Sequence, residues 1–384
     1  MVARPKKRVK KAVKKETTPQ RRGAETSFFY DRDMSMLQFN HRVLQQAQDP
    51  DTPILERVRF LSIFHSNLDE FFMKRIGVPR NTDLFSTKLH RQDRMTMIRS
   101  KVQDLVEQAA KCFLNDVKPE LDHEGIFLLP WEKLSPQEKL ATQNIFEKKI
   151  FSVLTPLAVD PAHPFPHISN LSTSLAVSIR APGSKERSFA RVKIPKIFPA
   201  WFCLNPEDET QGNDLRFVSS HDIIQNDLHT LFPSMAIVST LIFRITRNIE
   251  LEYEEERTYD DFVEMVEQEL KQRRFGEVVK LEHNPAADGW LLDYLKSELE
   301  LEETLIFEMP ALIDFSSLNG IASLNIPELK FPHWNPAVPK ALMDESFWYY
   351  RAKGLYRSSS VRKLQRQCRI FHPISSHRST SESD

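Results

Sequence analysis

The sequence predicts an α+β multidomain fold, in which an all-α N-terminal domain is followed by an α+β domain. Apolar residues between positions 28 and 128 recur at three- and four-residue steps, the spacing of helices that pack on neighbouring helices. Between positions 129 and 323, apolar and polar residues alternate beside further helical spacing, so strands and helices intermix there. A short C-terminal remnant follows neither pattern, and we expect it not to form native structure.

Three helices are expected in the N-terminal domain. The apolar stripe of the first helix consists of Met36, Phe39, Val43 and Ala47. The segment 49–53, which contains two prolines, should end this helix. The stripe of the second helix consists of Leu55, Val58, Leu61 and Phe64, and that of the third of Ile98, Val102, Leu105, Ala109 and Phe113. Pro119 should end or bend the third helix, because proline has no backbone N–H.

The α+β domain is predicted from alternation and from capping patterns. Strands are expected around positions 175–179, 189–195, 241–245 and 279–281. A helix over 258–270 is indicated by Thr258 with Asp261 three residues later, which is a capping-box pattern. A further helix is expected over 290–301.

Composition and charge exclude several classes of protein. Of the 384 residues, 40% are hydrophobic and 28% charged, as in ordinary globular proteins, and no apolar run approaches the roughly 18 residues of a membrane span. Cys112, Cys203 and Cys368 lie far apart, so we expect no disulfide framework or zinc site, and a reducing cytoplasm is the natural compartment.

The N-terminal residues 1–27 are expected to form a basic, disordered arm. Residues 1–22 contain ten Lys or Arg and one Glu, although the net charge of the whole chain is zero. Such an arm attracts polyanions such as nucleic acid, or anionic lipid at the inner face of a membrane. The alternative is a solvated extension without a binding role.

Asn67 is the first candidate binding residue. An Asn amide offers a hydrogen-bond donor and an acceptor side by side, which is the pattern that an adenine edge presents. Phe60 and Phe64 lie nearby in the sequence and could pack on the base. The alternative is structural: Ser66 and Asp69 also form a capping-box pattern, which would place Asn67 in the first turn of a helix.

Arg273 and Arg274 form the second candidate site. Adjacent arginines at a helix end, followed by Gly276, could hold phosphate through forked, charge-assisted hydrogen bonds. The alternative is a helix C-cap with a solvated basic end. His163 and His167 have the spacing of a helical metal pair, but the prolines around them exclude a helix, so we predict no metal site. The known glycine-rich phosphate loops are also absent from the sequence.

Several segments of the sequence resemble the long polyphosphate kinases. They are Phe28–Arg75 with its motif Asn-Leu-Asp-Glu-Phe, Phe189–Pro195, Phe243–Asn248 and Leu329–Pro336. The similarity runs from Phe28 to about Phe347, and it implies a helical N-terminal domain over 28–128, a head domain over 129–323 and the start of a first catalytic domain over 324–350.

The resemblance also implies a function. These enzymes transfer the terminal phosphate of ATP to polyphosphate through a phosphohistidine, with Mg²⁺ on the phosphates, and form homo-oligomers. By position, Asn67 would contact ATP, Phe60 would line the adenine pocket, and Arg273 and Arg274 would lie near the nucleotide or the polyphosphate product.

The resemblance ends before residue 351. Residues 351–380 contain eight Lys or Arg and no Asp or Glu, and the family's His-His-Pro-Tyr and His-x-Lys segments do not occur. Codons chosen for Tyr356–Arg378, read in another frame, spell a family-like string that contains His-His-Pro-Tyr. We therefore expect residues 351–384 to be a frameshifted, disordered tail and the truncated chain to be inactive alone. The alternative is a non-catalytic module for nucleotide or polyanion binding or for dimerisation.

Overall fold

The computed structural model describes residues 31–76, 88–159, 165–205, 214–249, 276–285 and 287–332. The chain's contacts separate Met1–Phe331 from Pro332–Asp384, and the elements below belong to the first unit. Five predictions lie outside the described residues: the basic arm 1–27, the helix 258–270, His163, the pair Arg273 and Arg274, and the tail 351–384. Most of the predicted start of a catalytic domain, 324–350, also lies outside them.

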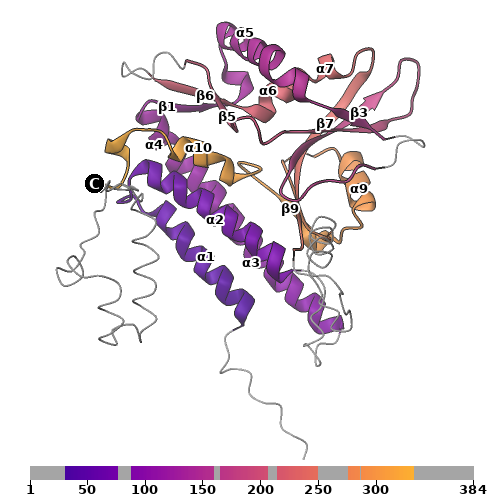
Figure 1. Ribbon diagram of the computed structural model, residues 1–384. Coiled ribbons are helices and arrows are strands. Elements are labelled where there is room, and N and C mark those ends of the chain that lie inside the picture. Colours follow the sequence, from indigo (N-terminus) through magenta and orange to yellow (C-terminus); the bar gives the residue numbers. More distant parts are fainter. Residues whose placement is uncertain are drawn as a thin grey trace, which may run out of the picture. The chain divides into compact units, whose positions relative to one another are not determined.

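The N-terminal part is a group of helices, as predicted. Helix α1 (Arg32–Gln48) packs on α2 (Ile54–Arg75) and on α3 (Lys88–Cys112) (Figure 1). Asp31 caps α1, because its carboxylate accepts hydrogen bonds from the backbone N–H groups of Asp33 and Met34, both at 2.9 Å. The predicted break falls between α1 and α2, and the predicted stripe of α2 is buried, with Leu55, Val58, Leu61 and Phe64 at most 1% exposed.

In the predicted stripe of α1, Ala47 is buried as expected, but the rest of the stripe is misplaced on the helix. The buried face consists of Leu37, Asn40, Leu44 and Ala47, whereas Phe39 is 54% exposed. The shift is possible because Asn40, a polar residue, is buried with a hydrogen-bond partner: its Nδ2 donates to the backbone O of Phe64 at 3.0 Å. A pattern that counts only apolar residues cannot include such a position.

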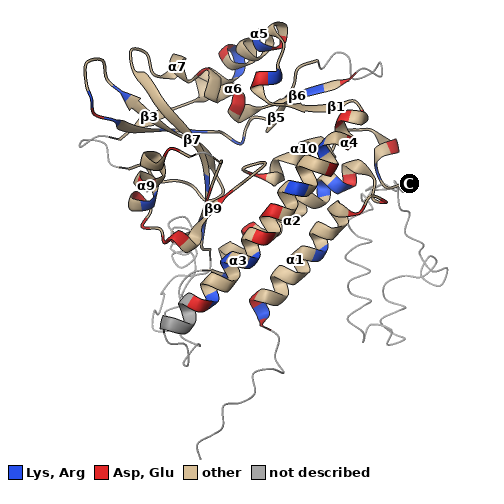
Figure 2. Cartoon of the chain, turned by 180° about the vertical axis from the view of Figure 1, so that it is seen from behind, with Lys and Arg blue, Asp and Glu red and all other residues tan. Residues whose placement is uncertain are grey.

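The third helix ends before Pro119, as expected. Its predicted stripe is buried, and α3 passes into a π-helical turn over Phe113–Val117. Helix α4 (Lys118–His123) then begins with Pro119 in its first turn, where the missing N–H needs no partner. Figure 2 shows acidic and basic residues along the visible sides of α2 and α3, as solvated helix faces require.

Among the described residues, the main sheet has six strands in the order β2-β4-β3-β7-β8-β9, antiparallel except for the last pair. The four predicted strands are confirmed as β3 (Thr173–Arg180), β4 (Ser188–Lys193), β7 (Ala236–Arg247) and β8 (Val278–His283). The edge strands are β2 (Pro156–Ala158) and β9 (Ile306–Glu308). The predicted helix over 290–301 is α9 (Gly289–Glu298), which packs with one apolar face of the sheet.

A smaller sheet was not predicted. Its strands are β1 (Ile126–Leu129), β6 (Leu215–Ser219) and β5 (Trp201–Cys203), with β1 parallel to β6. Helices α5 (Pro136–Ile145), α6 (Ser220–Asn226) and α7 (Leu228–Leu231) belong to this part of the chain, whereas α10 (Asn319–Ala322) packs on α2. Strand β1 lies at the end of the range that was expected to be all-α. It was not predicted because its partner strand is about 90 residues away in the sequence and gives no local signal.

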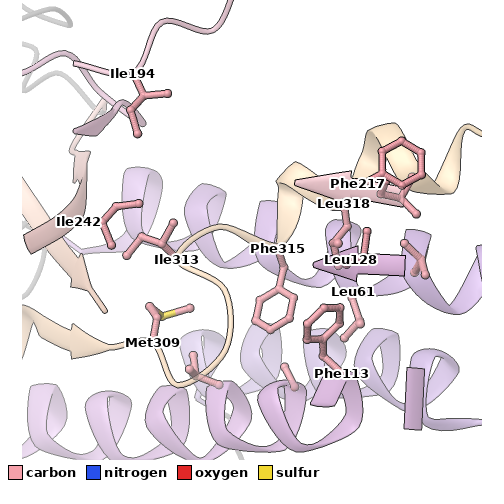
Figure 3. Close-up of a cluster of buried hydrophobic side chains, with 14 of the residues drawn as sticks. Leu61, Phe113, Leu128, Ile194, Phe217, Ile242, Met309, Ile313, Phe315 and Leu318 are labelled. Atoms are coloured by element: carbon pink, nitrogen blue, oxygen red, sulfur yellow. The ribbon is translucent and has the colours of Figure 1, made fainter. Parts of the chain in front are cut away.

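The helices and the main sheet share one hydrophobic core. Leu61 from α2, Phe113 after α3, Leu128 from β1 and Ile242 from β7 all belong to it, and Phe315 packs edge-on against Phe113 at 5.8 Å between ring centroids (Figure 3). The second face of the sheet has its own cluster beneath α9. None of the described helices is long and apolar enough to cross a membrane.

Candidate functional site

Asn67 lies in the middle of α2, thirteen residues after the helix begins at Ile54. The capping-box alternative is therefore wrong. The hydroxyl of Ser66 donates instead to the backbone O of Ser62 at 3.0 Å, and the carboxylate of Asp69 binds basic side chains of the sheet. Asn67 is half-buried, so its side chain is partly accessible from outside the core.

A cavity of about 180 Å³ lies beside Asn67, between α1 and α2. Its lining residues are Met36, Leu37, Phe39, Asn40, Asn67, Leu68, Glu70 and Phe71. Most of them are apolar, and the two asparagines form its amide wall. The Nδ2 of Asn67 donates to the Oδ1 of Asn40 at 3.1 Å, so the two amides are joined. Apolar walls with a few fixed polar groups are the usual lining of a small-molecule site, and the volume is below the roughly 300–1,000 Å³ of a pocket that encloses a whole ligand.

The structure does not bring Phe60 to this cavity. Phe60 lies seven residues before Asn67, about 10 Å along the helix axis, and is partly buried against the core. Phe64 is 1% exposed, so it offers no ring face to a ligand. The aromatic residue that lines the cavity and is exposed is Phe39, which sequence reasoning placed in the core instead. The sequence signal that could have placed Phe39 outside the core is the neighbouring polar Asn40, which lies between the buried Leu37 and Leu44.

A buried ionic network anchors α2 to the sheet, two residues after Asn67. Arg244 of β7 binds both carboxylate oxygens of Asp69, with Nη1 to Oδ1 at 2.8 Å, and also binds Glu282 of β8 at 2.7 Å. The Nζ of Lys280 lies 2.9 Å from Asp69 and 2.7 Å from Glu282. All four side chains are at most 5% exposed, so the contacts are shielded from water. Sequence reasoning missed this network.

The charges within the network shift the pKa values of Asp69 and Arg244. Burial would raise the pKa of the Asp69 carboxyl, but the charges of Lys280 and Arg244 outweigh burial and hold that pKa well below its usual range. Burial would lower the pKa of Arg244, and the carboxylates of Asp69 and Glu282 raise it instead. Both groups therefore stay ionised at neutral pH, which keeps α2 fixed to the sheet.

His65 also lies against this network. Its Nε2 is 3.4 Å from Asp314 and 3.8 Å from Glu282, and its imidazole is within reach of Asp69. Although His65, Asp69 and Glu282 bring ligand atoms within 4.8 Å of one another, Arg244 and Lys280 already occupy both carboxylates. These residues do not fit a metal ion, because binding it would displace two cations.

A second hollow of about 380 Å³ faces another side of α2. Its charged lining residues are Asp69, Glu70, Asp314, Lys74, Lys196 and Arg244, three acidic and three basic. Asp69 pairs with Arg244, and Glu70 pairs with Lys74. Because these charges balance, the hollow has no surplus of positive charge with which to attract a phosphate.

Comparison with known proteins decides the family. The model of the polyphosphate kinase N-terminal domain matches residues 29–129, and the model of the polyphosphate kinase middle domain matches residues 137–321. The chain belongs to the polyphosphate kinase family. The resemblance noted in the sequence is thus confirmed for the N-terminal and middle domains.

Relatives in this family are similar over most of the chain. The polyphosphate kinase of Streptomyces coelicolor is 42% identical over 310 residues, which are 79% of this chain and 40% of the relative. That of Thermosynechococcus vestitus is 39% identical over 319 residues, 81% of this chain and 43% of the relative. The crystal structure of polyphosphate kinase from Porphyromonas gingivalis has the same fold, with a TM-score of 0.67 at 23% identity over 83% of this chain and 44% of that one. The chain spans less than half the length of these relatives.

The candidate phosphate-binding pair cannot be placed relative to the cavity. Arg273 and Arg274 lie outside the described residues, although Gly276 is described and its backbone O accepts from Nη1 of Arg247 at 2.7 Å. Glu70 is the one carboxylate that lines the cavity beside Asn67 in the described part of the chain, and it pairs with Lys74. This donor set does not fit Mg²⁺, which prefers several oxygen ligands around it.

Proposed function

We propose that this chain holds ATP at the cavity beside Asn67, as the nucleotide-binding part of a polyphosphate kinase. The reaction of such an enzyme converts ATP and polyphosphate(n) to ADP and polyphosphate(n+1). The observation that carries the proposal is the amide of Asn67, which is fixed by Asn40 in a cavity with apolar walls. Its donor and acceptor complement an adenine edge.

The cavity's other residues suit a flat base. Phe39 is exposed beside the amide wall, and an aromatic ring there packs on a purine face. Met36 and Leu68 supply apolar surface that excludes water, which strengthens hydrogen bonds to the base. Phe60, two helical turns away, remains a weaker candidate for the adenine pocket.

The phosphate groups would extend toward basic residues. We propose Arg273 and Arg274 for this role, since paired guanidinium groups bind phosphate oxygens in forked geometry. Magnesium would arrive with the nucleotide as part of the substrate.

Phosphoryl transfer is the part of the reaction for which the sequence offers no candidate residue. The family resemblance implies a phosphohistidine in a His-x-Lys segment, and no such pair occurs in this sequence. We therefore propose that the chain binds nucleotide without transferring phosphate by itself. Incubating purified protein with ATP and a polyphosphate primer tests this: no chain growth is expected, and growth would contradict it.

Nucleotide binding is tested by isothermal titration of the purified chain with ATP. We expect binding that Asn67→Ala weakens by about tenfold or more, the loss of hydrogen bonds at a desolvated site. Ser66→Ala is the matched control, because Ser66 is adjacent but its hydroxyl bonds to Ser62 and does not line this cavity. No binding, or equal binding by the Asn67 variant, would contradict the proposal.

A second function is favoured by the basic N-terminus. Ten Lys or Arg in residues 1–22 could bind polyphosphate or another polyanion, making the chain a polyanion-binding or dimerisation module without catalysis. Binding that falls steeply with salt and is lost when residues 1–22 are deleted would support it. The homo-oligomer implied by the family is tested by sedimentation of the same two proteins.

A further inference from the structure

The hydrogen bonds of Asn40 have a fixed direction. A backbone carbonyl can only accept, so the group that Asn40 presents to the backbone O of Phe64 must be its Nδ2, at 3.0 Å. The other end of the same amide, Oδ1, then faces Asn67 at 3.1 Å. Because that oxygen can only accept, Asn67 must donate with its own Nδ2.

The direction of these hydrogen bonds decides which atom of Asn67 is left for a ligand in the cavity. With its Nδ2 facing Asn40, Asn67 has its Oδ1 left over, and this oxygen has no hydrogen-bond partner among the residues that the structure describes. Turning the Asn67 amide over would set its oxygen against the oxygen of Asn40. It would also leave the Oδ1 of Asn40 without the donor that Asn67 supplies, and Asn40 is only 3% exposed. The Oδ1 of Asn67 is thus fixed toward the ligand, beside the second N–H of its Nδ2, which Asn40 does not use.

We propose that Asn40 is a positioning residue that makes the site selective for 6-aminopurines over 6-oxopurines. The inference rests on the proposed function, that a purine binds beside Asn67. The 6-amino group of adenine is a donor and meets the fixed Oδ1, whereas the 6-oxo group of hypoxanthine or guanine is an acceptor and would face it with like polarity. Neither partner of such a pair can rotate to relieve the conflict.

The role of Asn40 is distinct from packing. If Asn40 is replaced by alanine, the amide of Asn67 loses its fixed partner and can turn to present either its oxygen or its nitrogen. ATP then loses part of its advantage while ITP gains, so the ratio of the two affinities falls. A loss of stability alone would weaken the binding of ATP and of ITP equally, and the ratio of the two affinities would not change.

The experiment is a competition titration of the 384-residue chain with ATP and ITP, which differ at the purine 6-position and the adjacent ring nitrogen. We expect the unaltered chain to bind ATP about tenfold more tightly than ITP, and Asn40→Ala to reduce this ratio to about threefold or less. Leu44→Ala is the matched control: Leu44 is buried one turn later on α1 and bonds to neither amide, so its variant should be less stable but keep the ratio. An unchanged ratio in Asn40→Ala would overturn the proposal.

A ligand series keeps the test independent of how well the variant folds. Purine riboside triphosphate lacks a 6-substituent, so the unaltered chain should bind it more weakly than ATP and more tightly than ITP. Equal binding of all three, with binding still dependent on Asn67, would overturn the role of Asn40 while leaving the proposed function intact. If the unaltered chain binds none of them, the proposed function fails as well.

Discussion

Asp69 and Arg244 are 175 residues apart in the sequence and form a buried, two-point ion pair. Asp69 lies two positions after Asn67 on α2, and Arg244 lies on β7, an inner strand of the main sheet. The pair therefore fixes the helical turn that carries the candidate nucleotide contact to the sheet. Lys280 and Glu282 complete the charge balance around it.

Replacing Asp69 by alanine should destabilise the protein strongly. The change leaves Arg244 and Lys280 buried with one carboxylate fewer, and breaking such a pair from one side costs about 3–5 kcal/mol. Urea unfolding measures this as a lower free energy of unfolding. The exposed pair of Lys101 and Asp104 supplies the control: Asp104→Ala should change the free energy by at most about 1 kcal/mol. Equal effects of the two variants would contradict the importance of the buried network.

The ion pair of Glu138 and Arg216 should make stability depend on pH. A hydrogen bond from Arg216 lowers the pKa of Glu138 to about 2, from its ordinary 4.5. A carboxyl whose folded pKa is depressed stabilises the fold above its unfolded pKa, and this contribution is lost as the pH falls from about 4.5 toward 2. Glu138→Gln should thus lower the free energy of unfolding at pH 6, with a smaller difference at pH 3. A difference that is the same at both pH values would show that the charge is not responsible.

Phe39 should contribute to nucleotide binding rather than to stability. Its side chain is 54% exposed and lines the cavity, so Phe39→Ala should weaken ATP binding by about two- to tenfold through lost ring packing. Thermal unfolding should change little. Ile197, which is 79% exposed and does not line the cavity, is the control, and Ile197→Ala should leave binding unchanged.

The cavity geometry assigns the base contact to Phe39, whereas the family resemblance assigns it to Phe60, and variants of the two residues distinguish these expectations. Phe60 packs against the core and does not line the cavity, so Phe60→Ala should lower stability more than it lowers ATP affinity. If ATP affinity falls in Phe60→Ala and not in Phe39→Ala, the base lies elsewhere along α2 than the cavity suggests.

Elements with a strong local period were predictable from the sequence. The stripes of α2 and α3 identify these helices because each buries one face. The alternation of apolar and polar residues identifies β3, β4, β7 and β8, although both faces of these strands are largely buried. The short strands β1, β5 and β6 escaped prediction, since they have three to five residues and β1 pairs with a strand about 90 residues away. The face of α1 was misplaced because a polar residue, Asn40, occupies a core position.

The site was predictable in part. Asn67 could be proposed because an amide in an apolar run is unusual, and the family resemblance gave it a role. Asn40 could not, since its importance arises from two hydrogen bonds that link it to α2, 24 and 27 residues away. The network around Asp69 joins residues 175 and 211 positions apart, and no sequence spacing records such a pairing.

The most direct test of the account is a crystal structure of this chain with a non-hydrolysable ATP analogue. The account predicts that the adenine lies between α1 and α2, with its 6-amino nitrogen at about 2.7–3.2 Å from the Oδ1 of Asn67 and the Nδ2 of Asn67 still bonded to Asn40. A base bound away from Asn67, or one that meets the Nδ2 of Asn67 while its oxygen faces Asn40, would contradict it.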